Sequence, residues 1–486
     1  MTELKLDLSN LNEVFPADFT QDQIAEGQTV LLKELSARLH TFYGGKMMTI
    51  PKAALLGFNW FNVWYSPGVS KVSTSIREDV NASFTMTNRS NLVGIVSDST
   101  RVLGDGDCTP PGGLGVMEGK AFLMKMLGGV DGIALCIDSK NDEGKQDAQK
   151  IIDFVKMGQH SFGAINLEDI SQPVCFEVLD RLRDECEIPV WHDDAQGTGC
   201  VTLAGLFNAL KLAEKDIKDV RIVLLGAGAA NTTIANLIIQ AGGDPKKIAL
   251  FDRHGGIRTD REDYNVDKRF YKKWELAAIT NPDQIETIEE AMKGADVLIG
   301  LSQPGPDTVK PEWVSSMAEK SIVFVCANPV PEIYPHAAKA AGAFIVATGR
   351  GDFPNQVNNS LCFPGILKGA LTVSASKITD AMAITAARAI ADFAEERGID
   401  TNNIVPTMEE LDLFPRVAAD VAVQAEKDGV ARNIKSWQEV YDITKKDIND
   451  TKLLFDSMQS SGLIEQPPQA MINEALAQTI KQVQSN

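Results

Sequence analysis

The chain has 486 residues, of which 44% are hydrophobic and 23% are charged. These are the values of a soluble globular protein, and the length exceeds what one compact core accommodates, so at least two domains are expected. The formal net charge of −19 argues against a nucleic-acid or anionic-membrane surface, because phosphate groups require a basic face. A small anionic substrate in a locally basic pocket remains compatible with this charge.

Cysteine usage and segment composition indicate a cytoplasmic protein. The seven cysteines are widely spaced and form no CxxC pair, which is typical of reduced thiols and not of a disulfide framework or a zinc site. The N-terminal residues include acids and contain no apolar signal segment. No run of about 18 apolar residues occurs, so no membrane span is expected.

The first part of the chain is predicted to hold a helical segment, residues 1–45, and then an α/β domain, residues 46–200. Apolar residues recur at helical spacing over Gln23–Tyr43. From residue 46 onward, short apolar runs alternate with helical stretches, which is the pattern of a parallel sheet with crossover helices. The expected strands and helices are Leu92–Val96, Glu118–Met126, Gly132–Ile137 and Gln146–Met157.

A second α/β domain, residues 201–368, is predicted to be Rossmann-like, and residues 369–486 are predicted to be helical. Its first strand, Arg221–Leu225, runs into a glycine-rich loop and a helix. The later strands are expected at Lys247–Phe251, Asp296–Gly300, Ser321–Cys326 and Ala343–Ala347. The tail beyond Gln466 is expected to be loose or an oligomer contact. The predicted fold class is α/β, with two parallel-sheet domains between helical terminal segments.

The loop after Arg221–Leu225 has the spacing of a dinucleotide-binding turn. Gly226 permits the tight turn, and Gly228 lets backbone N–H groups approach a pyrophosphate at the helix N-terminus. The third position of such motifs holds Gly or Ala, and here it is Asn231, which departs from the pattern, although Ala229 and Ala230 keep the turn small. A glycine turn that binds no dinucleotide is the alternative interpretation.

The choice between NAD and NADP stays open on the sequence. Asp252 ends the second strand of this domain, where a carboxylate accepts from the ribose hydroxyls of NAD. Arg253, His254 and Arg258 follow it immediately and suit a 2′-phosphate instead.

Two pairs of acids follow apolar runs in the first α/β domain. Glu168 and Asp169 close one run, and Asp193 and Asp194 close another. Strand ends in open α/β sheets are ligand sites, and four carboxylates brought together require a cation, with oxygen ligands favouring Mg²⁺ or Mn²⁺. The alternative is helix capping by these acids. The occurrence of two pairs at two strand ends favours the metal.

Several separate motifs resemble those of the malic enzyme family, in its smaller-subunit microbial branch. The resemblance runs from about residue 45 to about residue 430. The motifs are Trp64–Val69, Arg101–Asp107, Gly115–Lys120, Ile165–Asp169, His192–Thr198, Ala327–Glu332, Ala347–Arg350, Pro354–Asn359 and Phe363–Gly365.

The resemblance implies a role for each matching residue. Tyr65 matches the family's general acid and Lys120 its catalytic lysine, with Asp193 beside the lysine. The residues that match metal ligands are Glu168, Asp169 and Asp194, and those that match substrate or nicotinamide contacts are Arg101, Asn328 and Asn359. Arg101 matches an arginine that larger family members use on a malate carboxylate. A homodimer or homotetramer is implied as well, with Tyr65 reaching the site of a neighbouring subunit.

The implied reaction is oxidation of malate by NAD or NADP and decarboxylation to pyruvate, with Mg²⁺ or Mn²⁺. A lysine with a pKa of about 10.4 is a poor base at neutral pH, and desolvation and a nearby dication are expected to lower that pKa. Two alternatives remain on the same residues: a malolactic enzyme and an oxaloacetate decarboxylase. A non-catalytic nucleotide-sensing protein is a third, and it predicts a missing lysine or an incomplete set of carboxylates.

Overall fold

The computed structural model describes residues 3–103 and 105–485, and these residues form two compact units. One unit combines the two ends of the chain, Met1–Met48 and Asp450–Asn486, and the other is Thr49–Asn449. Among the described residues, no helix has the length and apolarity that crossing a membrane requires.

The unit formed by the chain ends is built on two helices, α1 (Gln21–Tyr43) and α20 (Gln469–Ser485). Helix α1 begins with a capping box at Thr20 and ends at Gly44 in the left-handed region, both of which are strong sequence signals. Apolar residues of both helices share a small core, which contains Leu31, Leu35, Ile472, Ala475, Leu476 and Ile480. The expectation of a loose tail beyond Gln466 is therefore wrong, because that tail forms α20.

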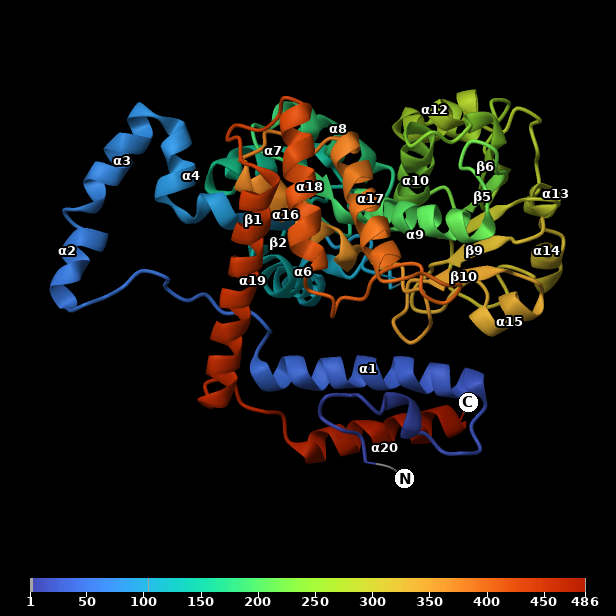
Figure 1. The fold of residues 1–486 in the computed structure, drawn as a ribbon, viewed down its shortest axis with the longest axis horizontal. Coiled ribbons are helices and arrows are strands. Elements are labelled where there is room, and N and C mark those ends of the chain that lie inside the picture. Colours follow the sequence, from blue (N-terminus) through green and yellow to red (C-terminus); the bar gives the residue numbers. More distant parts are fainter. Residues whose placement is uncertain (1–2, 104, 486) are drawn as a thin grey trace. The chain divides into compact units, whose positions relative to one another are not determined.

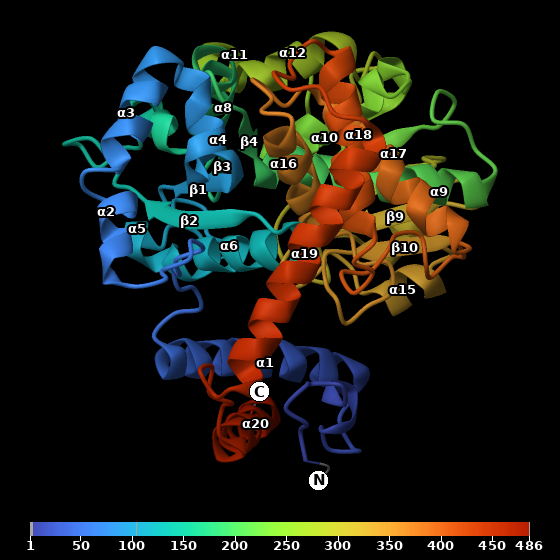
Figure 2. The same ribbon diagram turned by 60° about the vertical axis from the view of Figure 1, so that its left-hand side comes forward.

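The first sheet of the larger unit confirms the predicted parallel arrangement. Its strands are β1 (Leu92–Ser97), β2 (Asp131–Cys136), β3 (Ala164–Leu167) and β4 (Val190–His192), in the order β2-β1-β3-β4. The helices that pack on it are α6 (Leu114–Gly128), α7 (Ala148–Gly158) and α8 (Val174–Glu185). Because strand residues alternate between faces, Val93 and Ile95 contact the core that includes α6, whereas Val96 packs with α7 and α8. Figure 2 shows α6 lying along β2.

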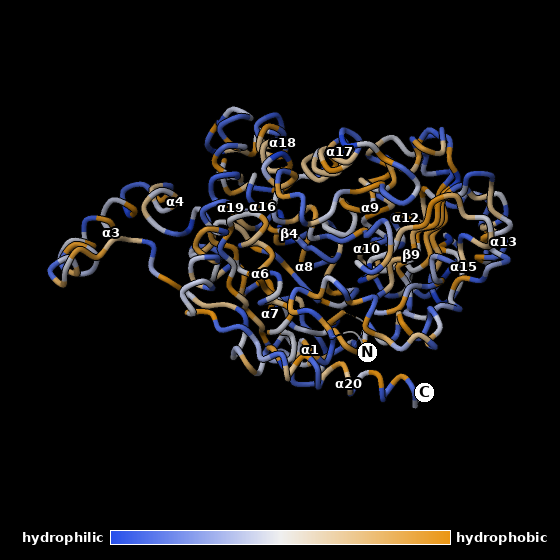
Figure 3. The backbone as a smooth tube through the Cα atoms, turned by 60° about the horizontal axis from the view of Figure 1, so that its bottom comes forward, coloured by the Kyte–Doolittle hydropathy of each residue, from blue (hydrophilic) through white to orange (hydrophobic). Residues whose placement is uncertain are grey.

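The second sheet is Rossmann-like, as predicted. Its strands are β5 (Ile222–Leu225), β6 (Ile248–Asp252), β7 (Gly255–Gly256), β8 (Val297–Gly300), β9 (Ile322–Val325) and β10 (Ile345–Thr348), in the order β10-β9-β8-β5-β6-β7. All pairs are parallel except β6 with β7. Both faces of this sheet are covered, which explains why its strands are nearly continuous apolar runs, visible around β9 in Figure 3.

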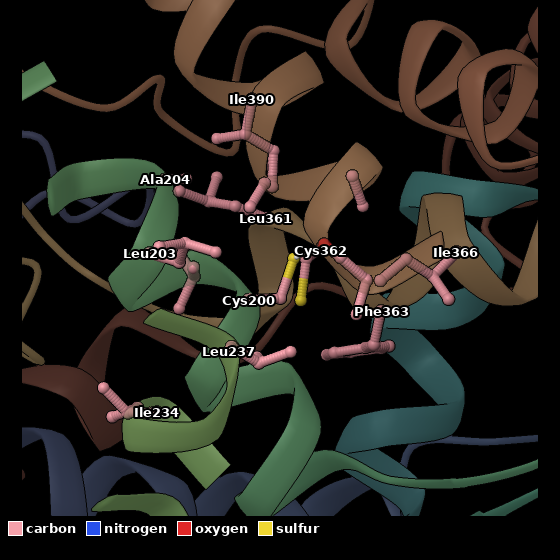
Figure 4. Close-up of a cluster of buried hydrophobic side chains, with 14 of the residues drawn as sticks. Cys200, Leu203, Ala204, Ile234, Leu237, Leu361, Cys362, Phe363, Ile366 and Ile390 are labelled. Atoms are coloured by element: carbon pink, nitrogen blue, oxygen red, sulfur yellow. Dashed lines mark hydrogen bonds between the residues drawn. The ribbon is translucent and has the colours of Figure 1, made fainter. Parts of the chain in front are cut away.

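Helices from three regions of the chain join the two sheets through one core. They are α9 (Thr198–Ala213), α10 (Ala229–Gln240), α16 (Phe363–Thr372), α17 (Asp380–Glu396) and α18 (Leu413–Lys427). Figure 4 shows Cys200 and Leu203 of α9 packed near Cys362, Phe363 and Ile390. The strand β4 leads through residues 193–197 directly into α9, so this core fixes the end of β4 beside the start of α9, where the candidate site lies.

Candidate active site

Three carboxylates meet at the ends of neighbouring strands of the first sheet. Glu168 and Asp169 directly follow β3, and Asp194 lies in η6 (Asp193–Gly197), the π-helical turn after β4. One oxygen from each of these side chains lies within 4.8 Å of the others. The capping alternative is wrong, because α8 begins only at Val174 and the Asp194 side chain caps no helix.

The hydrogen bonds around these carboxylates leave an acceptor position open to a cation. Asn166 donates to Glu168 Oε2 at 2.9 Å, and the Asp169 N–H donates to Asp194 Oδ2 at 2.7 Å. The Asp169 Oδ2 atom is buried and has no hydrogen-bond partner in the described part of the chain. A buried carboxylate oxygen without a donor is costly unless a cation binds it. The donor set, all oxygen, fits Mg²⁺ or Mn²⁺.

The electrostatics of the three acids support the same interpretation. Burial, followed by repulsion from Asp194, raises the pKa of Asp169 to about 8. Burial likewise raises the pKa of Glu168 well above its ordinary value. A dication between these groups removes the repulsion that keeps them from ionising together.

Lys120 reaches this cluster from α6. Its Nζ lies 2.5 Å from Asp193 Oδ2 and 3.2 Å from Glu168 Oε1, and its side chain is 11% exposed. Burial lowers the pKa of Lys120, but the carboxylates of Asp193, Glu168 and Asp194 outweigh burial and raise it above the usual lysine value. These carboxylates favour the ammonium form of Lys120, and a dication held by the same carboxylates would oppose that effect.

Asp193 is held as the partner of Lys120. Trp191 Nε1 donates to Asp193 Oδ1 at 3.2 Å, and the aspartate is fully buried. A Cβ atom at Gly197 would overlap Asp193 Oδ1, so the glycine that follows the acid pair is required by this packing. Asn359 begins the 3-10 helix η9 (Asn359–Leu361) before α16, and its Oδ1 lies 3.4 Å from Lys120 Nζ.

The side chains of two predicted site residues, Arg101 and Tyr65, do not join the carboxylate cluster. The Arg101 N–H donates to the Asp169 carbonyl at 3.0 Å, so its backbone adjoins the cluster, and its side chain is exposed. Tyr65 is 75% exposed, directly after the short helix α2 (Phe61–Trp64). Helices α2 and α3 (Val69–Glu78) stand apart from the first sheet in Figure 1. Among the described residues of one chain, no hydrogen bond or ion pair joins Tyr65 to Lys120, whose partners are Glu168, Asp193 and Asn359.

The glycine-rich loop has the expected form, with a structural explanation for its unusual third position. Gly226 has φ +98°, and a Cβ there would meet the Leu301 carbonyl, so only glycine fits. Gly228 precedes α10, which begins at Ala229 and Ala230, and a Cβ at Gly228 would meet no atom of the other described segments within 4 Å.

Asn231 stands where such loops usually have a small residue, and its side chain forms hydrogen bonds to the turn. Its side-chain amide donates to the Leu225 carbonyl at 2.9 Å and to the Gly226 carbonyl at 2.8 Å. Helix and strand are thus tied together by an amide where other such loops use close packing.

Asp252 is engaged by two basic residues that the sequence did not single out. Arg261 donates to both Asp252 oxygens, at 2.9 and 3.1 Å, and Lys273 donates to Oδ2 at 2.9 Å. Burial raises the pKa of Asp252, but these hydrogen bonds outweigh it and lower the pKa to about 2. Arg253 extends beside His254, with Nε 3.0 Å from the imidazole Nε2.

Asn328 follows β9 at the edge where the second sheet's strands end. A Cβ at Gly349 would lie 3.1 Å from its Nδ2, so the asparagine amide lies against the end of β10. Arg350 donates to the neighbouring Pro329 carbonyl at 2.7 Å and holds the loop.

Some functional neighbours escaped sequence reasoning. Asn166 and Trp191 each lie two residues before an acid of the cluster, on the same side of a strand, and this alternation is the signal that points to them. His192 is buried, and neither ring nitrogen has a hydrogen-bond partner within the described residues. Burial lowers its pKa.

Comparison with known proteins places the two sheets in defined families. Residues 57–183 match the family model described as "Malic enzyme, N-terminal domain", and residues 195–427 match "Malic enzyme, NAD binding domain". The second match defines the class of the protein as an NAD-binding oxidoreductase.

Individual relatives agree with the family models. The "NAD-dependent malic enzyme" of Geobacillus stearothermophilus is 43% identical over 390 residues, covering 80% of this chain and 78% of the relative. The "Bifunctional malic/malolactic enzyme" of Bacillus subtilis is 40% identical over 416 residues, covering 85% of this chain and 98% of the relative. The crystal structure of Entamoeba histolytica malic enzyme superposes with a TM-score of 0.97 at 60% identity, covering 99% of this chain and 100% of that one. The chain belongs to the malic enzyme family.

Proposed function

We propose that this protein oxidises malate and decarboxylates it to pyruvate and CO2, with reduction of NAD or NADP. We assign the chemistry to a catalytic domain of residues 46–200 and the dinucleotide to residues 201–368, flanked by helical segments 1–45 and 369–486. The observation that carries the proposal is the contact of Lys120 Nζ with Asp193 at 2.5 Å and with Glu168 at 3.2 Å, beside three clustered carboxylates. The seven free thiols support a cytoplasmic location.

The cluster of Glu168, Asp169 and Asp194 would hold the divalent cation, Mg²⁺ or Mn²⁺. The loop from Gly226 to Asn231, with Asp252 and Arg253, would hold the dinucleotide. When bound, the dication supplies Lewis-acid stabilisation of charge on the C2 oxygen, and the nicotinamide accepts a hydride from C2.

Lys120 is the proposed base and Asp193 its positioning partner. The unprotonated Lys120 amine would take the proton of the malate C2 hydroxyl, and the buried Asp193 carboxylate would hold Nζ in place and stabilise the ammonium ion that forms. Asn359, 3.4 Å from the same nitrogen, and Asn328 would orient the substrate and the nicotinamide. Arg101 would bind a malate carboxylate.

Tyr65 is the proposed general acid that protonates the enol carbon after CO2 leaves. Its 75% exposure, on an arm rich in exposed apolar side chains, supports action in the site of a neighbouring subunit. The exposed apolar residues of this arm include Leu55, Leu56, Phe58, Phe61, Val63 and Trp64. We therefore propose a homodimer or homotetramer in which each site is completed by Tyr65 of another copy.

Replacing Lys120 tests the proposal directly. Lys120→Ala should lower kcat for malate oxidation by about 100-fold or more, and oxaloacetate decarboxylation should fall with it, because both need this proton donor and acceptor. The matched control is Lys125→Ala on the same helix, where Nζ pairs with Asp131 at 2.9 Å away from the cluster. Near-normal malate turnover by the Lys120 variant would refute the assignment.

Malolactic activity on the same residues is the second candidate, and the name of the Bacillus subtilis relative favours its inclusion. The absorbance of NAD(P)H, followed with malate and Mn²⁺, separates the two. Stoichiometric reduction of the coenzyme is the expected result. Formation of lactate without net reduction would assign the malolactic reaction.

A further inference from the structure

A buried carboxylate outside the proposed catalytic set lies beneath the dinucleotide edge of the second sheet. Glu332 is 0% exposed and follows the Asn328–Pro331 loop. Within the described residues, the groups that donate hydrogen bonds to its carboxylate are neutral: the N–H groups of Ser302 and Ala327 and the Ser302 hydroxyl. A buried carboxylate held only by neutral donors is costly to retain, and burial raises the pKa of Glu332 accordingly.

The two oxygens of Glu332 bridge the ends of two adjacent strands. Oε1 accepts from the Ser302 N–H at 2.9 Å and from the Ser302 hydroxyl at 3.3 Å. Oε2 accepts from the Ala327 N–H at 3.1 Å. Ser302 lies just after β8, and Ala327 lies just after β9. The Glu332 side chain therefore links the two loops that follow these strands.

Both of these loops border the proposed coenzyme site. A Cβ at Gly226 would meet the Leu301 carbonyl and lie 3.0 Å from Ser302 Cα, so the first loop packs directly against the glycine-rich turn. Asn328, proposed to contact the nicotinamide and the substrate, is the residue after Ala327. A Cβ at Gly300 would lie 3.0 Å from the Glu332 carboxyl, so this space is already filled by the side chain.

We propose that Glu332 is a positioning residue for the coenzyme, which holds the loops after β8 and β9 at the spacing that the dinucleotide requires. The inference rests on the proposed use of NAD or NADP. A carboxylate is needed here because each of its two oxygens accepts a hydrogen bond from a different loop. A glutamine there would turn an NH2 group toward one of the N–H groups and release that loop.

The test compares Glu332→Gln with the wild-type enzyme and with Asn208→Ala. Asn208, on α9, is also buried and donates to the Ala391 and Ile404 carbonyls at 2.9 and 2.8 Å, away from the strand ends. The dissociation constants of NADH and NADPH are measured by coenzyme fluorescence, that of Mn²⁺ by calorimetry, and Tm by thermal unfolding. These readouts separate loop positioning from a general loss of stability.

Glu332→Gln should raise the dissociation constant of the preferred coenzyme about tenfold, the effect of leaving one buried donor unpaired. Its Mn²⁺ affinity should stay within about twofold of wild type, because the carboxylate cluster belongs to the first sheet. Asn208→Ala should lower Tm without changing coenzyme affinity. Unchanged coenzyme affinity in folded Glu332→Gln would overturn the inference.

A second variant keeps the test decisive if Glu332→Gln does not fold. Glu332→Asp keeps the charge but is one methylene shorter, so it reaches only one of the two loops, and the same loss of coenzyme affinity is expected. Wild-type affinity in that variant would overturn the inference too. Failure of the wild-type enzyme to bind either coenzyme would instead contradict the proposed function.

Discussion

At Asn231 and Asp252, side-chain hydrogen bonds change what a familiar loop pattern means. The amide of Asn231 binds two carbonyls of the turn, so a residue that seems to weaken the motif stabilises it. Asp252 is the expected ribose acceptor, yet both of its oxygens are engaged by Arg261 and Lys273. These partners lie 5 to 21 positions away in the sequence, and no regular spacing marks them before the fold brings them together.

The contacts of Asp252 lead us to expect a preference for NADP. An Asp252 carboxylate already paired with two cations is a poorer acceptor for ribose hydroxyls, and the same cations suit a 2′-phosphate. Lys273→Ala should lower kcat/KM for NADP about tenfold more than for NAD, measured with both coenzymes at saturating malate. Lys272→Ala, whose side chain instead pairs with Asp180 at 2.7 Å, is the control. Equal losses with both coenzymes would contradict this expectation.

At the scale of elements, the unit formed by α1 and α20 depends on a narrow core. Leu31 of α1 is fully buried there, whereas its neighbour Leu32 is 43% exposed. Leu31→Ala should destabilise this unit by about 2–5 kcal/mol, the usual effect of truncating a buried leucine. Hydrogen exchange of α1 and α20 is the measurement, and Leu32→Ala should leave exchange nearly unchanged. Comparable protection in both variants would contradict a shared core.

The strands and most helices could be predicted from the sequence, and the reason is periodicity. Apolar runs such as Leu92–Val96 and Asp296–Gly300 are confirmed as β1 and β8 within two residues. Helix α20 lies within the predicted helical segment 369–486, but the tail beyond Gln466 was expected to be loose or an oligomer contact. Polar residues interrupt the apolar stripe of α20, which is buried only against α1. Local patterns report local structure, whereas the pairing of the two chain ends depends on contacts over more than 400 positions.

The candidate site was predictable in part, because acids after apolar runs reveal strand ends. The meeting of Glu168, Asp169 and Asp194 was expected from parallel-strand geometry and is present in the structure. Asn166 and Trp191 were not singled out, although each lies two residues before an acid on the same side of a strand. Glu332 was quoted only as part of a motif, and its contacts with two loops appear only in the fold. Their functional roles, like those of the predicted residues, are proposals for the experiments above.

At the scale of the whole molecule, a site that takes Tyr65 from another copy predicts complementation between inactive subunits. Tyr65→Phe and Lys120→Ala chains, each nearly inactive alone, should form a mixed dimer with one complete site and about half of the wild-type activity. Differently tagged chains allow the mixed dimer to be purified before malate turnover is measured. A mixed dimer as inactive as its parents would show that Tyr65 serves its own chain.

The proposed action of Tyr65 in the site of another copy would also link activity to abundance. If complete sites arise only when two copies meet, their number in dilute solution follows the square of the subunit concentration. Doubling a low concentration then raises malate turnover about fourfold, although every subunit keeps its fold. A cell that makes little of this protein would hold folded, metal-loaded and coenzyme-loaded chains with almost no flux through them, so expression level would act as a threshold for the reaction.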